Sequence, residues 1–281
     1  MSVPQTAYRV FYADQIPGRE SRRARAYVLA CTAGALITAA ATLLLILGAC
    51  TAFRARRLYA RCATLVGRLV LRLYGIDVRV HGAPPWPSCQ TVYVSNHTSS
   101  LDLFVLVALG LPNTRFFLSG FLRRVLPLGV ISWMMGTFFT VPQSRPAERT
   151  RIFRRAGDVL SRTRESVYLS PEGERVTTGT IGHFNKGAFH LATVLRAPIV
   201  PIFIHIPASI DPRRGLDARP GCVDVYVLPA IDTAGWRVSD LIVNKERVRD
   251  VFVRFEASQC RARLQACHEA FRPAVEERTW A

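Results

Sequence analysis

The chain has 281 residues, and its 37 Lys and Arg against 20 Asp and Glu give a formal net charge of +17 at pH 7. Such a charge favours anionic partners, either lipid headgroups at a membrane or nucleic acid. Because no recognisable nucleic-acid-binding module occurs and the basic residues are spread rather than clustered with aromatic ones, we expect membrane lipids as partners and no nucleic acid.

An uncharged run over residues 26–53 is the first element that the sequence predicts. About 20 apolar residues cross a bilayer as a helix, so this run is long enough for a retained transmembrane or deeply inserted helix. It is too long, and begins too far inside the chain, to resemble a cleaved signal peptide. Arginines flank the run on both sides, so charge bias does not fix its orientation.

A basic amphipathic helix is expected next. Arginines occupy its other faces, as in helices that lie at a membrane interface. Such a helix could equally pack on the rest of the protein, and both interpretations could hold together. The apolar positions that recur at helical spacing are Leu58, Cys62, Leu65, Val66, Leu69 and Leu73.

His97 and Asp102 lie on a turn between an apolar strand at residues 91–94 and an apolar helix at 101–106. Imidazole has the unperturbed pKa that suits a general base near neutral pH, and a carboxylate would fix its tautomer and stabilise the imidazolium. No G-x-S-x-G nucleophile elbow occurs, which argues against an α/β-hydrolase. The alternative is that Asp102 complements the helix dipole and His97 is an ordinary loop residue.

Residues 125–141 form a second uncharged stretch, interrupted by proline and glycine and short for a membrane span. It could line a tunnel for an acyl chain, enter the membrane interface, or form a buried core helix.

A second polar turn, which includes Glu172, Gly173 and Arg175, follows the apolar strand at 167–169. Open α/β sheets bind ligands at the carboxyl ends of their strands, so this turn and the His97 turn could share one crevice. The guanidinium of Arg175 suits a phosphate, Gly173 would let the backbone approach a ligand, and Glu172 could contact the acceptor or order the turn. The alternative is a solvated turn.

Four ordered blocks within residues 90–205 resemble the glycerolipid acyltransferases, the family typified by 1-acyl-glycerol-3-phosphate acyltransferase. The resemblance implies that His97 is the general base and Asp102 its partner. It implies acyl transfer from acyl-CoA or acyl carrier protein to a lysophospholipid, most simply 1-acyl-glycerol-3-phosphate, with phosphatidic acid as product. No metal or prosthetic group is expected. The blocks are residues 96–102, 136–141, 171–175 with 184–189, and 197–202.

One departure from the family concerns the acceptor. The family's second block often ends in an Arg implied to hold the acceptor phosphate, whereas this chain has Pro142 there. Arg145 could take that role, and Lys186 is a further candidate headgroup contact, unless it is a solvated helix residue. Alternatively, the acceptor is lyso-ornithine lipid or another non-glycerol lysolipid. A catalytically silent lipid-binding scaffold is a more distant alternative.

We therefore expect an α/β fold with a mixed, largely parallel sheet flanked by helices, preceded by a membrane-associated helical element. Its parts would be a basic segment (1–25), a two-helix anchor (26–80), the catalytic domain (81–233) and a C-terminal helical extension (234–281). Localisation to the inner or cytoplasmic membrane is expected, with the catalytic domain on the cytoplasmic side. Scattered cysteines, odd in number, suggest free thiols in a reducing compartment.

Overall fold

A seven-stranded sheet in the order β1-β7-β6-β2-β5-β3-β4 lies at the centre of the protein. The computed structural model describes residues 19–82, 86–176, 180–212, 215 and 217–271. Strands β2 to β6 run parallel, β7 is antiparallel to β6, and β1 is parallel to β7, which confirms the mixed, largely parallel sheet. The strands are β1 Ile76–His81, β2 Val92–Ser95, β3 Thr114–Ser119, β4 Phe138–Thr140, β5 Ser166–Leu169, β6 Ile199–His205 and β7 Gly221–Val227.

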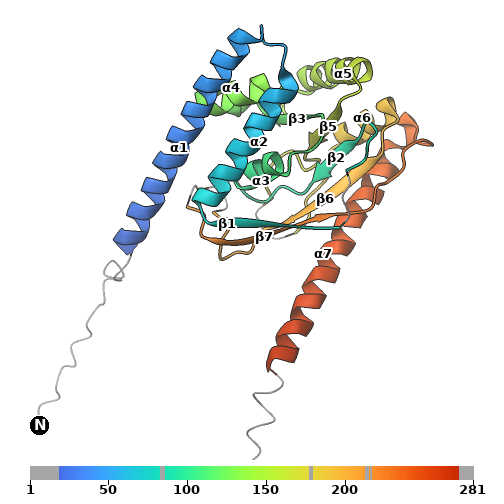
Figure 1. Cartoon of the computed structure of the whole chain (residues 1–281). Coiled ribbons are helices and arrows are strands. Elements are labelled where there is room, and N and C mark those ends of the chain that lie inside the picture. The colour runs from blue at the N-terminus through green and yellow to red at the C-terminus, as the bar shows by residue number, and fades with distance from the viewer. Residues whose placement is uncertain (1–18, 83–85, 177–179, 213–214, 216, 272–281) are drawn as a thin grey trace, which may run out of the picture.

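Helices cover both faces of this sheet (Figure 1). One buried cluster joins the sheet to α1 to α4, and a second joins its other face to α5 to α7. Alternate residues of β2 enter opposite clusters, since Tyr93 belongs to the first and Val92 and Val94 to the second. A strand buried on both faces is largely apolar, as Val92, Tyr93 and Val94 are in β2. The helices are α1 Arg19–Cys50, α2 Arg56–Leu73, α3 Asp102–Leu109, α4 Leu126–Met134, α5 Pro146–Thr163, α6 Gly187–Leu195 and α7 Leu241–Phe271, with 3-10 turns η1 Gly120–Arg124 and η2 Val238–Asp240.

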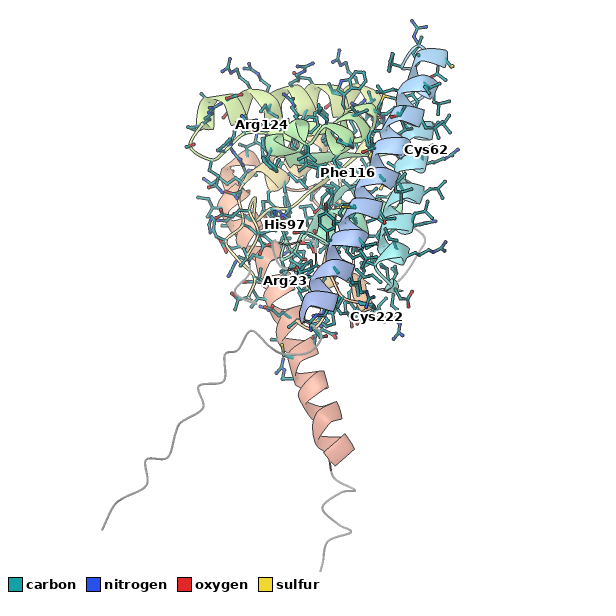
Figure 2. All side chains as sticks on the ribbon, turned by 90° about the vertical axis from the view of Figure 1, so that its left-hand side faces the viewer. Arg23, Cys62, His97, Phe116, Arg124 and Cys222 are labelled. Atoms are coloured by element: carbon teal, nitrogen blue, oxygen red, sulfur yellow. The ribbon has the colours of Figure 1, made fainter. Side chains whose placement is uncertain are left out.

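Helix α1 is the element long and apolar enough to cross a membrane, over residues 23–50. Most of its surface is exposed, although Ile37 and Leu44 are buried against the domain. The predicted apolar run therefore forms a helix, and that helix packs along one side of the protein (Figure 2).

Helix α2 buries only part of the apolar stripe that the sequence indicated, since Cys62, Val66 and Leu73 pack against the core. The sequence pointed to a stripe that includes Leu58, Leu65 and Leu69, but these three side chains are exposed. Small residues face the domain instead: a Cβ on Gly67 would lie 3.3 Å from backbone atoms of α3. The helix therefore packs closely on α3 and leaves an apolar stripe uncovered. Its buried residues are Tyr59, Ala63, Gly67, Val70 and Leu71.

A buried charged cluster holds the start of α2 against the sheet. The carboxylate of Glu165, which is 7% exposed, forms ion pairs with Arg56 of α2 and Arg115 of β3. Burial raises the pKa of Glu165, but the hydrogen bond from Arg115 and the charges of both arginines outweigh it, so the pKa lies below its ordinary value. Arg56 also donates to Asn113 Oδ1 at 3.0 Å.

The sheet begins earlier in the chain than the expected boundary at residue 81. Strand β1 covers Ile76–His81 and pairs along its length with β7, so its first five residues lie in the segment that we assigned to the anchor. Pairing with a strand that comes more than a hundred residues later leaves no local signal. The basic segment predicted for residues 1–25 lies largely outside the described residues.

Candidate active site

The segment that leaves β2 is fixed by a side-chain bridge to β6. Asn96, which is buried, donates through Nδ2 to the Ile204 oxygen at 2.9 Å and accepts the Ile204 N–H at Oδ1 at 2.8 Å. The amide thus replaces a strand pairing one residue beyond the end of β2. These two bonds therefore hold the backbone in place just before His97, at the carboxyl end of the strand.

Asp102 orients the imidazole of His97. Nδ1 of His97 lies 2.8 Å from Oδ2 of Asp102, and the same oxygen accepts the backbone N–H groups of Thr98 at 2.7 Å and Ser99 at 3.0 Å. A carboxylate only accepts, so Nδ1 carries the proton and Nε2 is the basic nitrogen. Asp102 is also the first residue of α3, so one carboxylate both holds the start of the helix and contacts the imidazole.

Glu172 is a buried structural carboxylate at the second turn, not a residue that faces a ligand. Its Oε2 accepts the His97 N–H at 2.6 Å and its Oε1 accepts the Gly182 N–H at 2.7 Å. The side chain is 3% exposed and does not line the cavity described below. Burial raises its pKa, while the two backbone N–H bonds lower it in part. Of the two roles considered for Glu172, ordering the turn is the one that the structure has.

Gly173 follows at a position that only glycine occupies without strain. Its φ is +76°, and a Cβ there would lie 2.8 Å from Nδ2 of Asn185. That same Nδ2 donates to the oxygens of Pro171 and Glu172, which fixes the turn against the segment before α6. The predicted close approach of this backbone to a ligand site is possible, since Gly173 lines the cavity.

Both turns line one cavity of about 740 Å³. His97, with a half-buried side chain, and Arg175 contribute to its wall, and Arg175 donates to Ser100 Oγ at 2.8 Å. Most of the remaining lining is apolar, with residues from α1, α2, α3, β3, η1 and α4. Figure 2 shows His97 and Phe116 in the domain beside α1. The cavity thus combines a base and a cation with apolar walls. The apolar lining includes Ala33, Ile37, Val70, Leu71, Phe116 and Leu122.

The stretch over residues 125–141 contributes to this cavity and to the protein surface. Val125, Pro127 and Leu128 line the cavity. Leu126 and Trp133 are exposed, whereas Ile131 and Met134 are buried. Parts of this stretch therefore line the cavity, are buried in the core or are exposed at the surface.

Comparison with known proteins agrees with this geometry. Residues 77–205 match the sequence model of the family described as Acyltransferase. This segment, which bears both turns of the site, is similar to acyltransferase domains. The chain is 33% identical over 181 residues to 1-acyl-sn-glycerol-3-phosphate acyltransferase alpha of Bos taurus, which covers 63% of this chain and 62% of that protein. It is 30% identical over 197 residues to the Saccharomyces cerevisiae 1-acyl-sn-glycerol-3-phosphate acyltransferase, with coverages of 69% and 63%.

A solved structure resembles the fold of this chain. The crystal structure of the 1-acyl-sn-glycerophosphate (LPA) acyltransferase PlsC from Thermotoga maritima superposes with a TM-score of 0.70 at 18% identity, over 85% of this chain and 97% of that one. This likeness establishes the fold. The chain spans somewhat over three fifths of the length of the curated relatives named above.

Two of the cations predicted to bind substrate lie outside the cavity. Arg145 is exposed just before α5 and pairs with Glu148 at 3.5 Å. Lys186 is exposed just before α6. Neither lines the cavity.

Arg149, which the sequence did not single out, lines the cavity one turn into α5. Its Nη1 donates to the oxygen of Val141 at 3.0 Å, which holds the guanidinium at the end of β4. The second block, residues 136–141, also ends at this point, immediately before Pro142. In the sequence Arg149 is one of several arginines of an amphipathic helix, and no local signal separates it from its exposed neighbours Arg151 and Arg154.

Proposed function

We propose that the protein is a membrane-bound O-acyltransferase that transfers a fatty acyl group from acyl-CoA or acyl carrier protein to 1-acyl-glycerol-3-phosphate, forming phosphatidic acid. The observation that carries this proposal is the His97–Asp102 pair in one mainly apolar cavity with two arginines. The names of the relatives support the acceptor.

His97 acts as general base in the proposed reaction. Nε2 takes the proton of the free acceptor hydroxyl while its oxygen attacks the thioester carbonyl carbon, forming the C–O bond. The C–S bond then breaks, and the leaving thiolate takes the proton back from the imidazolium. Asp102 stabilises that imidazolium through Nδ1, as an orienting carboxylate does in hydrolases. Ester and free thiol result, and the sequence of steps uses no metal or prosthetic group.

Arg175 and Arg149 hold the acceptor phosphate in this proposal. A phosphate monoester near neutral pH carries close to two negative charges, which two guanidinium groups match better than one. The apolar remainder of the cavity, at about 740 Å³ within the usual range for ligand sites, receives acyl chain.

In this proposal the lysolipid enters from the membrane, on the side of the protein that α1, α2 and α4 form. Helix α1 forms one wall of the cavity and also has the length of a bilayer span. Exposed leucines on α2 and Trp133 on α4 extend an apolar surface beside it. We propose that the catalytic domain faces the cytoplasm, where the thioester donors are made. The described cysteines are all free, which fits a reducing compartment.

The test is acyl transfer by the full-length, detergent-purified chain. Labelled acyl-CoA and labelled acyl carrier protein are offered with lysophosphatidic acid, other lysophospholipids and lyso-ornithine lipid, using wild type, His97→Ala and the control His81→Ala. We expect product from lysophosphatidic acid with wild type and His81→Ala, and a loss of about 10²- to 10⁴-fold with His97→Ala. If His97→Ala is as active as wild type, His97 is not the general base.

Acylation of lyso-ornithine lipid is the second candidate function, and Pro142 in place of the family's Arg favours it. Preference for that acceptor over lysophosphatidic acid in the same panel would select it. Transfer to no acceptor would leave a lipid-binding scaffold as the remaining alternative.

A further inference from the structure

We propose that the C-terminal helix α7 positions His97 through Arg249, the peptide bond between Ile181 and Gly182, and the carboxylate of Glu172. The catalytic role of His97 rests on the function proposed above. Helix α7 lies outside residues 77–205, so no comparison assigns it a part in the reaction.

Arg249 donates hydrogen bonds to two backbone oxygens of the segment before α6. Its Nε donates to the Gly182 oxygen at 2.8 Å and its Nη2 to the Ile181 oxygen at 3.0 Å. Arg249 is half-buried, and the fork of a guanidinium fixes two acceptors at once. A second contact joins the same elements, because Lys245 Nζ, on a 5% exposed side chain, lies 3.4 Å from Nε2 of His183.

One peptide group connects Arg249 to Glu172. The Ile181 oxygen that Arg249 holds and the Gly182 N–H that donates to Glu172 Oε1 belong to the same planar peptide unit. In a trans peptide these two groups point in opposite directions, so fixing the oxygen on the α7 side fixes the direction of the N–H on the Glu172 side.

Glu172 carries this constraint to the histidine. Its other oxygen accepts the His97 N–H at 2.6 Å, and the His97 oxygen accepts the N–H of Val176 at 2.8 Å. The backbone of the base is thus held on both sides of its Cα. Gly182 is closely packed, because a Cβ there would lie 2.6 Å from Val176 Cγ2. A shift of the 181–182 peptide is therefore transmitted to the backbone on which the imidazole stands.

The first arm of the test does not depend on activity. Hydrogen exchange followed by mass spectrometry on the full-length protein reports the Gly182 and His97 amides in peptides over 180–184 and 95–99. We expect Arg249→Ala to speed exchange in both peptides, while the control Arg247→Ala, an exposed arginine on the same helix, leaves both unchanged. Faster exchange at 180–184 alone would overturn the link to His97.

The second arm measures kcat and KM separately with lysophosphatidic acid. We expect Arg249→Ala to lower kcat by about 10- to 100-fold, because displacing a reacting group by about 1 Å costs that much, while KM changes by less than about twofold. Arg249→Lys, which retains one charged donor, should recover part of the loss and keeps the test available if the alanine variant folds poorly. A change confined to KM, or an equal loss with Arg247→Ala, would overturn the proposal.

A double-mutant cycle decides whether Arg249 acts through Glu172. If it does, Arg249→Ala adds less than about twofold to the loss caused by Glu172→Gln, because the path is already broken. If the losses of the two single variants instead multiply in the double variant, Arg249 does not act through Glu172. A wild type that acylates no acceptor would refute the proposed function, yet the exchange experiment would still decide the positioning claim.

Discussion

Oδ2 of Asp102 receives three donors, one from the ring of His97 and two from the backbone N–H groups of Thr98 and Ser99. The start of helix α3 therefore fixes the carboxylate, and the carboxylate fixes the imidazole. Oδ1 of Asp102 is buried and has no hydrogen-bond partner within the described residues. The pair is accordingly organised around a single oxygen atom.

We predict that Asp102→Asn lowers kcat by about 10²- to 10⁴-fold, since the wrong tautomer of His97 is then favoured or its imidazolium loses its partner. Thermal unfolding of the variant provides the control. A Tm within a few degrees of wild type with a large fall in kcat is expected, whereas unchanged kcat would remove Asp102 from the mechanism.

Arg149 and Arg145 should differ in their effect on acceptor binding. Arg149→Gln is expected to raise KM for lysophosphatidic acid by about 10- to 100-fold, because a hydrogen bond to a charged group contributes about 1.5 to 3 kcal/mol. Arg154→Gln, at an exposed position of the same helix, is the matched control. If Arg145→Gln raises KM and Arg149→Gln does not, the assignment from the cavity is wrong and the expectation from the sequence is right.

Glu165 should make the stability of the fold depend on pH in the acid range. Its pKa is lowered in the folded state, so the stability it contributes is present above its unfolded value, about 4.3, and is lost as the pH falls through the folded value. We predict that Glu165→Gln lowers the Tm near neutral pH and that the difference from wild type shrinks below about pH 4. A difference independent of pH would mean that packing, not charge, is responsible.

Trp133 should contact lipid. It is exposed on α4, next to Phe53 at the end of the α1–α2 connection. In nanodiscs with brominated lipid, we predict strong quenching for a protein whose only tryptophan is Trp133 and weak quenching for one whose only tryptophan is Trp236, which packs against the opposite sheet face. Equal quenching of the two would contradict a membrane surface on the α1–α4 side.

Short-range motifs predicted the centre of the site because its residues are close in sequence. His97 and Asp102 are five residues apart, and Gly173 and Arg175 occupy one turn, so each group is visible without knowing the fold. The parallel sheet then brings the two turns to one edge, as expected for strands of an open α/β sheet.

Contacts between distant segments could not be predicted in this way. Helix α2 shows why: large apolar residues attract notice, yet close packing on α3 selects Ala63 and Gly67, while Leu58, Leu65 and Leu69 remain exposed. Arg149 and Arg249 look like solvated arginines until the cavity and the backbone oxygens that they contact are placed beside them. Glu172 likewise required its two N–H partners to be known before its role was clear.

The use of α1 as a wall of the cavity bears on the order in which the protein is made. Residues 30–38 leave the ribosome well before the strands and turns that bear His97 and Arg175. If α1 spans a membrane, as proposed above, it would be inserted in the bilayer before the sheet is made. The sheet would then close the cavity onto a helix already surrounded by lipid. The cavity would therefore first close at the membrane. A newly synthesised protein would take up lysolipid directly from the surrounding bilayer, without a carrier that brings it.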